Sequence, residues 1–225
     1  MLGAVWSEIL DLVFPPRCAA CGEPVEEGPF CPICADAVEP VPSGCSRCGL
    51  PGPDATCGAC LAHPPTFDGA RAAGLFGGPL ADAIHALKYR GRPVLARPLG
   101  AWLASRVPLP PGAAVVSVPL GRRRRRRRGY DQAALLAAAL AREAGAPRLR
   151  AALERVRETA PQVGRDRDAR ARNVRGAFAA RGVAGRDLVL VDDVVTTGAT
   201  ADACARALRA AGARSVTVVS LARAE

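Results

Sequence analysis

The chain has 225 residues, of which 49% are apolar, enough to bury one ordinary core with a small appendage, so an intrinsically disordered protein is excluded. Its formal net charge of +10 would attract nucleic acid or small phosphorylated ligands, and charge alone does not choose between them. No stretch approaches the roughly 18 apolar residues that a membrane span needs, and Glu8 and Asp11 stand where a signal peptide has positive charge, so we expect a cytoplasmic protein without a membrane span.

The first segment, residues 1–16, has the pattern of a short amphipathic helix. Its apolar residues recur at helical spacing, and Pro15 and Pro16 would end the helix. We expect this helix to pack on its own domain. The apolar positions are Leu2, Val5, Trp6, Ile9, Leu10 and Val13.

Residues 17–63 contain eight of the nine cysteines, arranged as four Cys-x-x-Cys pairs. A two-residue gap lets one tight turn aim both sulfurs at the same ion, and two pairs complete a tetrahedral site of four thiolates. The sequence therefore predicts a double zinc ribbon with two structural Zn²⁺ ions, because four thiolates leave no open position for catalysis. The predicted ligands are Cys18, Cys21, Cys31, Cys34, Cys45, Cys48, Cys57 and Cys60.

The cysteine pairs can be combined in two ways. Loop closure favours neighbours, which puts Cys18 to Cys34 on one ion and Cys45 to Cys60 on the other, and an interleaved arrangement is the alternative. A disulfide framework would need an oxidising compartment, and an iron–sulfur cluster would also use four thiolates, but the paired spacing favours zinc. Cys204, alone in a later Ala-rich stretch, is expected to be a small buried apolar residue.

From residue 66 to 225 short apolar runs alternate with helical patterns, which is typical of βα units and a parallel sheet flanked by helices. The charged segment 159–175 has few large apolar groups and is expected to be a mobile loop. We predict strands over 70–76, 114–118, 188–191 and 215–221, and helices over 80–88, 93–106, 131–144 and 199–211.

Seven consecutive arginines, Arg122 to Arg128, follow the predicted strand that ends at Val118. Such a run is usually a solvated surface. We consider two interpretations: a mostly solvated helix start from which one or two guanidiniums, such as Arg122 and Arg128, face a ligand, and a contact with nucleic acid, since arginine recognises phosphates well.

Residues 188–200, LVLVDDVVTTGAT, combine a buried strand, two carboxylates at its carboxyl end and a Thr/Gly loop that opens a helix. A helix start offers free N–H groups to a phosphate, and ligands of parallel α/β sheets sit at the strand ends. Adjacent carboxylates repel phosphate but can accept hydrogen bonds from the vicinal hydroxyls of a ribose. The site residues predicted here are Asp192, Asp193, Val194, Thr196, Thr197, Gly198, Ala199 and Thr200.

This string resembles the signature with which type I phosphoribosyltransferases bind 5-phosphoribosyl-1-pyrophosphate (PRPP). The resemblance implies a type I phosphoribosyltransferase-like α/β fold, Mg²⁺ bound with PRPP, ribose hydroxyls on the two acids and the 5′-phosphate on the loop from Thr196 to Thr200. It further implies that the loop after Val118 binds pyrophosphate, through Pro119, Leu120, Gly121 and Arg122.

Over nearly its whole length the chain resembles the ComF family, named for natural competence. The motifs are PPRC, the double zinc ribbon, LKYRGR at 87–92, VPL with RGYDQ, ARNVRGAF at 171–178 and VDDVVTTGAT. The resemblance implies a link to DNA uptake and transformation. It also implies that Lys88, Arg90, Tyr130, Gln132, Arg172 and Asn173 lie in motifs that surround the PRPP site. Arg128, from the arginine run, is a further candidate to face the ligand.

Two hypotheses follow. The first is an enzyme that transfers the phosphoribosyl group from PRPP to an acceptor that the sequence does not identify; Thr196 stands where purine-salvage enzymes carry a carboxylate, which argues against that role. The second is an adaptor that binds single-stranded DNA, or a competence helicase or processing protein, and uses the PRPP pocket for sensing without turnover.

Overall fold

A computed structural model describes residues 16–53, 55–158, 174 and 176–224 of the chain. The predicted N-terminal helix, Arg172 and Asn173 lie outside these residues, as does most of the predicted loop 159–175, of which Val174 is described and buried. Among the described helices, none combines the length and apolar character needed to cross a bilayer. The elements are α2 (Pro32–Asp36), α3 (Gly58–Ala62), β1 (Gly69–Leu75), α4 (Gly78–Tyr89), a 3₁₀ turn (Pro93–Leu95), α5 (Ala96–Arg106), β2 (Ala114–Ser117), α6 (Arg122–Arg128), α7 (Gln132–Glu143), β3 (Leu153–Arg155), β4 (Phe178–Ala180), β5 (Asp187–Val195), α9 (Ala199–Ala210) and β6 (Ser215–Arg223).

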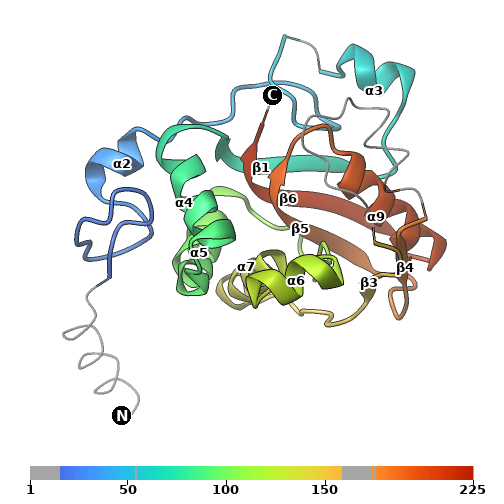
Figure 1. Cartoon of the computed structure of the whole chain (residues 1–225). Coiled ribbons are helices and arrows are strands. Elements are labelled where there is room, and N and C mark those ends of the chain that lie inside the picture. Colours follow the sequence, from blue (N-terminus) through green and yellow to red (C-terminus); the bar gives the residue numbers. More distant parts are fainter. Residues whose placement is uncertain (1–15, 54, 159–173, 175, 225) are drawn as a thin grey trace.

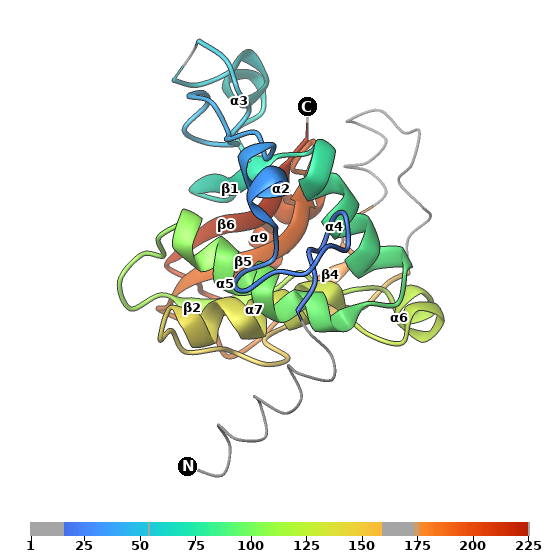
Figure 2. The same cartoon turned by 90° about the vertical axis from the view of Figure 1, so that its left-hand side faces the viewer.

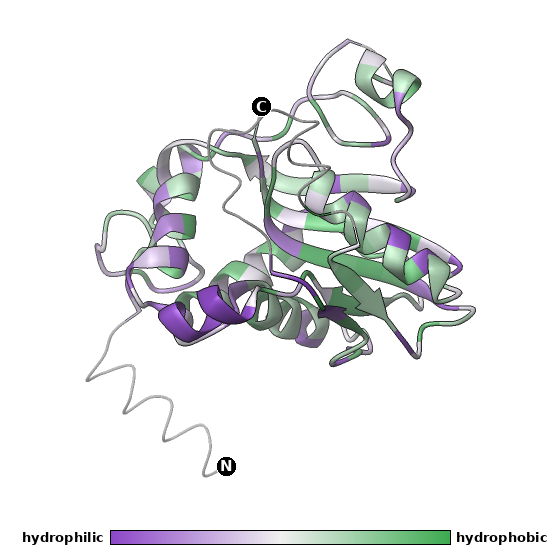
Figure 3. Ribbon diagram, turned by 45° about the vertical axis from the view of Figure 1, so that its right-hand side comes forward, coloured by the Kyte–Doolittle hydropathy of each residue, from purple (hydrophilic) through white to green (hydrophobic). Residues whose placement is uncertain are grey.

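The centre of the protein is a parallel sheet in the order β1-β6-β5-β2 (Figure 1). Its strands form because both faces are covered: the side chains from Leu188 to Val191 are at most 1% exposed. Figure 3 shows the apolar strands and the strongly hydrophilic α6 at the margin. The predicted α/β class, a parallel sheet with flanking helices after a cysteine-rich segment, is confirmed.

The two faces of the sheet carry different layers. One core cluster joins β-strand residues such as Val189 and Leu221 to α4, α5 and α7. The other joins Leu190 and Val218 to α9 and the short antiparallel pair β3–β4. Helices α5 and α7 pack closely because Gly100 has no side chain: a Cβ there would lie 2.4 Å from the Cβ of Ala139.

Several element boundaries differ from those predicted. The strand expected over 188–191 continues to Val195, because the ladder with β6 runs on through Asp192↔Ser220 to Val195↔Arg223, so both acids lie inside the strand. The helix expected over 93–106 begins as a 3₁₀ turn. The arginine run forms its own helix, α6, which ends at Gly129 with φ +84° before α7 begins, and the β3–β4 pair was not predicted.

Candidate functional site

A pocket of about 540 Å³ opens where β1, β5 and β6 end, bounded by α4, α6 and the start of α9. Parallel strands present their carboxyl ends at one edge of the sheet, which is where ligands bind in such folds. Most of the predicted site residues meet here. The predicted residues that line the pocket are Lys88, Pro119, Leu120, Arg128, Gln132, Asp192, Asp193, Val194, Thr196, Thr197, Gly198, Ala199 and Thr200.

The loop between β5 and α9 is a tight turn that leads directly into a helix. Gly198 adopts φ +76°, a left-handed conformation that favours glycine, and caps the start of the 12-residue helix α9. The ring of Phe67, which is 1% exposed, supports it from below, because a Cβ on Gly198 would lie 3.6 Å from that ring. The turn therefore places the start of α9, which is the positive end of the helix dipole, at the pocket.

Arg223, which sequence reasoning missed, fixes the start of this loop. Its guanidinium is buried and its Nη1 donates hydrogen bonds to the carbonyls of Val195, at 3.0 Å, and Thr196. The next residue, Ala224, lines the pocket. A buried guanidinium that donates hydrogen bonds to two consecutive carbonyls holds the backbone of the loop in one conformation. The only signal in the sequence is a charged residue at the end of an otherwise apolar strand.

Asp193 is part of a buried polar chain on the α7 side of the sheet. Its carboxylate accepts from Lys88 Nζ at 2.6 Å and from Gln132 Nε2 at 2.8 Å, and Gln132 Oε1 accepts from Arg128. Burial lowers the pKa of Lys88, but the carboxylates of Asp193 and Asp192 outweigh burial, so its net pKa is raised. Lys88 is therefore a cation at the floor of the pocket.

Asp192 points to the opposite face of the sheet, as alternation along a strand requires. Its pKa is raised from 3.8 to about 8, first by burial and then by the neighbouring charge of Asp193. Its Oδ1 accepts the backbone N–H of Asp193 at 2.8 Å. The two acids thus line the same pocket in different environments. Asp193 is paired with Lys88, and Asp192 is largely protonated at neutral pH.

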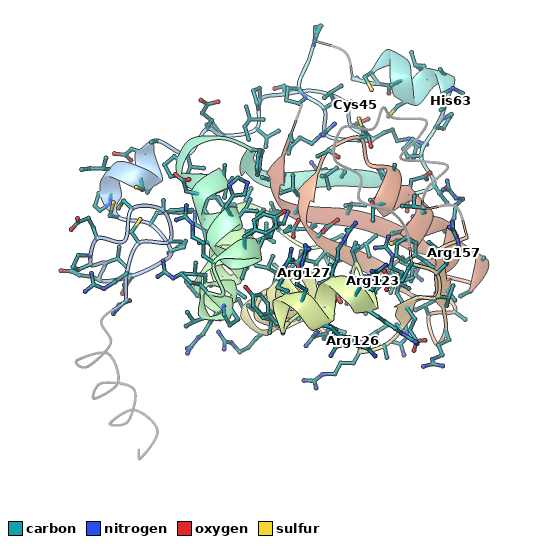
Figure 4. The ribbon with its side chains drawn as sticks, viewed as in Figure 1. Cys45, His63, Arg123, Arg126, Arg127 and Arg157 are labelled. Atoms are coloured by element: carbon teal, nitrogen blue, oxygen red, sulfur yellow. The ribbon has the colours of Figure 1, made fainter. Side chains whose placement is uncertain are left out.

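The wall opposite the loop is basic. The side of α6 that borders the pocket carries Arg124, Arg127 and Arg128, and β3 adds Arg155. Of the α6 arginines labelled in Figure 4, Arg127 lies on the side toward the sheet and Arg126 points away from it. Sequence reasoning missed Arg124 and Arg127, because the side of the arginine run that faces the pocket depends on how α6 is rotated about its axis. It also missed Arg155, which belongs to the short strand β3.

The remaining predicted residues lie differently. Gly121 and Arg122 are outside the pocket lining, and the Glu158 carboxylate covers Gly121, where a Cβ would lie 2.7 Å from Oε2. Arg90 and Tyr130 are also outside it. The Tyr130 hydroxyl donates to the carbonyl of Leu87 and so ties the start of α7 to α4. The missed residues Phe76, His85 and Tyr89 line the pocket, and the i, i+3, i+4 spacing of His85, Lys88 and Tyr89 was the available signal.

The eight paired cysteines form two separate groups, Cys18–Cys21–Cys31–Cys34 and Cys45–Cys48–Cys57–Cys60, in each of which all the sulfurs lie within 4.8 Å of one another. The predicted pairing of neighbours is therefore confirmed. Burial raises the pKa of the Cys18 and Cys45 thiols, but hydrogen bonds from backbone amides together outweigh burial and lower both pKa values to about 6. Each group therefore has a thiolate ready for a metal. Four sulfurs at this spacing fit a tetrahedral Zn²⁺ site.

The two groups lie on different parts of the sheet (Figures 1 and 2). The first group belongs to the core on the side of the sheet that α5 covers. There the rings of Phe30 and Trp102 pack edge to face with their centroids 5.5 Å apart. The second belongs to the core of the α9 face together with Phe67. Cys204 is fully buried in α9, as predicted, and belongs to neither sulfur group.

Comparison with known proteins agrees with this architecture. Residues 9–61 match the double zinc ribbon domain and residues 131–225 match the phosphoribosyl transferase domain. The DNA utilization protein YhgH of Salmonella typhi is 37% identical over 94% of this chain and 99% of its own, and that of Escherichia coli K12 is 35% identical with the same coverage. Competence protein F of Haemophilus influenzae is 30% identical over 92% of this chain and 90% of its own. The chain therefore belongs to the ComF family of DNA utilization and competence proteins, in which a double zinc ribbon precedes a phosphoribosyltransferase domain.

Proposed function

We propose that this protein binds PRPP with Mg²⁺ in the pocket at the ends of β1, β5 and β6, and that it transfers the phosphoribosyl group to an acceptor with release of pyrophosphate. One observation carries the proposal: two carboxylates, a helix-start loop and a wall of cations line the same pocket. PRPP needs the same set, since it has a 5′-phosphate, two ribose hydroxyls and a pyrophosphate. A cytoplasmic location goes with this proposal, because thiolate metal sites persist in reducing compartments.

The loop from Thr196 to Thr200 would hold the 5′-phosphate, because a helix start offers N–H donors and a positive dipole end. Asp192 and Asp193 would accept hydrogen bonds from the ribose hydroxyls. Pro119 and Leu120, with the arginines of the α6 face, would surround the pyrophosphate, whose departure builds up negative charge that fixed cations stabilise.

The residues present also suit Mg²⁺. Carboxylate oxygens are the ligands this ion prefers beside phosphates, and Asp193 and Asp192 line the pocket. Asp192, whose pKa is raised to about 8, would lose its proton when the ion binds. When bound, the ion would neutralise charge on the pyrophosphate. Lys88, already paired with Asp193, would keep that carboxylate oriented before the ligand arrives.

Titration calorimetry with PRPP, in the presence and absence of Mg²⁺, tests the binding. The double variant Asp192→Asn/Asp193→Asn should lose PRPP binding, while Asp82→Asn, an exposed acid of α4 outside the pocket lining, should bind as the unmodified protein does. Full binding by a folded double variant would refute the assignment of the site. Pyrophosphate release after addition of candidate acceptors then distinguishes transfer from sensing.

A second candidate function is the binding of single-stranded DNA on the outer side of α6. Arg122, Arg123, Arg125 and Arg126 are exposed and lie outside the pocket lining, so a strand there would not compete with PRPP. Such binding should weaken steeply with salt, with a slope that falls when Arg122 and Arg126 become Gln. A DNA affinity that does not change with salt concentration would refute this second function. The double variant Asp192→Asn/Asp193→Asn should bind DNA with the affinity of the unmodified protein.

A further inference from the structure

A second cavity, of about 620 Å³, lies beside β1, the edge strand of the sheet. Its walls come from the segment 41–49, which links the two cysteine groups, from β1, from the loop after α5 and from the ends of β5 and β6. The linking segment lies close against β1, since a Cβ on Gly49 would be 2.8 Å from the carbonyl oxygen of Ala70. Val195 is the one described residue that lines both this cavity and the pocket of the two acids.

The described residues that line this cavity carry positive charge and no negative charge. Arg71 comes from β1, Arg106 from the end of α5 and Arg223 from the end of β6. None of the three takes part in an ion pair between described residues. Three cations without a carboxylate beside them give the cavity a positive potential that attracts an anion.

The guanidinium of Arg223 has one edge that makes no hydrogen bond with the described residues. Its side chain is buried, and its hydrogen bonds to the carbonyls of Val195, Thr196 and Ala224 all use Nη1. Nε is buried and has no partner there. The edge formed by Nε and Nη2 is one with which a guanidinium binds an oxyanion through two parallel hydrogen bonds. A buried donor without an acceptor is unfavourable, so an oxyanion at this edge would remove that cost.

The rest of the cavity offers apolar area. Val41 and Pro42 contribute from the linking segment, and Val107, Pro108 and Leu109 contribute from the loop after α5. Binding sites for small molecules commonly combine such walls with a few polar groups that fix the orientation of the ligand. A ligand that matches this cavity therefore has an anionic group and an apolar body.

We propose that this cavity binds a small organic anion. Its carboxylate or phosphate group pairs with Arg71, Arg106 and Arg223, and its apolar body packs on the walls that Val107 and Leu109 help to form. The site is separate from the pocket of the two acids, and its existence does not depend on PRPP binding.

The bound anion also acts on the loop between β5 and α9. Nη1 of Arg223 holds the carbonyls of Val195 and Thr196, and Thr196 lines the pocket of the two acids. An anion on the other edge of the same guanidinium restrains that side chain and so restrains the start of the loop. The anion therefore raises the affinity for PRPP, and PRPP raises the affinity for the anion by the same factor.

Benzoate and phenyl phosphate are the probes, because both carry an apolar ring and they differ in the anionic group. Titration calorimetry of the full-length protein, without PRPP, measures their affinities. Fluorescence reports where they bind, since the Arg106 guanidinium lies 5.3 Å from the centroid of the Trp102 ring. The chain has two tryptophans, so Trp6→Phe makes Trp102 the single reporter.

Four variants test the assigned residues. Arg71→Gln and Arg106→Gln should each weaken binding of the probe about two- to fivefold, because both arginines are exposed. Arg223→Met should weaken it about tenfold or more, because a buried charged hydrogen bond is lost. Arg97→Gln removes an exposed arginine of α5 outside the cavity lining and is the matched control, which should bind as the unmodified protein does.

Binding that weakens in Arg71→Gln and Arg106→Gln but not in Arg97→Gln supports the site, and the tighter of the two probes identifies the anionic group. Binding that is unchanged in the double variant Arg71→Gln/Arg106→Gln, or no binding of either probe, overturns it. Because these titrations contain no PRPP, their result stands whether or not PRPP binds.

The coupling is measured separately, as the affinity for PRPP with and without saturating benzoate, which carries no phosphate for the PRPP pocket. Benzoate should raise that affinity about fivefold in the unmodified protein. An unchanged PRPP affinity would overturn the coupling through Arg223.

Discussion

Replacing Asp193 with asparagine should destabilise the protein, because it leaves Lys88 buried without its counter-ion. The side chains of Lys88 and Asp193 are 17% and 6% exposed, and their charged atoms lie 2.6 Å apart. Breaking one side of a buried pair costs about 3 kcal/mol, since the remaining charge stays desolvated. For a chain of this size that lowers Tm by about 6 to 12 °C.

Replacing Asp192 with asparagine should instead raise the free energy of unfolding. A pKa raised from 3.8 to about 8 means that the folded protein holds a proton that the unfolded chain has released, so this carboxyl lowers stability as pH rises from 4 to 8. The loss of stability from this carboxyl is at most about 6 kcal/mol. We expect a gain of about 2 kcal/mol at pH 8 for Asp192→Asn, because the buried amide is itself imperfectly satisfied.

Chemical denaturation of the two variants at pH 5 and pH 8 measures both effects. The gain from Asp192→Asn should shrink toward pH 5, while Asp82→Asn should stay within about 0.5 kcal/mol of the unmodified protein at both. Both acid variants should bind PRPP poorly. Equal stability changes of the same sign in the two variants would refute the placement of these acids in different environments.

Three other perturbations test the supports of the pocket. Gly198→Ala should cost about 1 kcal/mol, because alanine is strained at φ +76°, and should weaken PRPP binding in calorimetry. Arg223→Met should keep the fold, seen by circular dichroism, yet weaken PRPP binding about tenfold, since one charged hydrogen bond to a loop carbonyl such as that of Val195 is worth about that much. Cys45→Ser should lower the bound zinc measured by elemental analysis, whereas Cys204→Ser, in a residue that belongs to neither sulfur group, should leave it unchanged.

The strand, turn and helix start at residues 188–200 were predictable because everything that defines them is local. A run of apolar residues, two acids and a Thr/Gly turn lie within residues 188–200, and each has a separate physical reason. The cysteine groups were predictable for the same reason, and the pairing of neighbours follows from short loops. In both cases the sequence spacing sets the distance in space.

What could not be predicted depends on contacts between distant segments. The acids belong to β5 only because β6 continues the ladder beside them. Strand β3 has three residues and no pattern of its own, so Arg155 gave no sign of facing the pocket. In α6 every residue is the same, and only the packed structure decides that Arg124, Arg127 and Arg128 line the pocket.

The second cysteine group shares its core cluster with Phe67, and Phe67 lies beneath Gly198. A zinc ion on these cysteines would therefore stand two packing steps from the loop of Thr196 to Thr200. Without zinc the packing beneath this loop would be lost. The supply of zinc would in this way decide how much of the protein can bind the ligand that we propose.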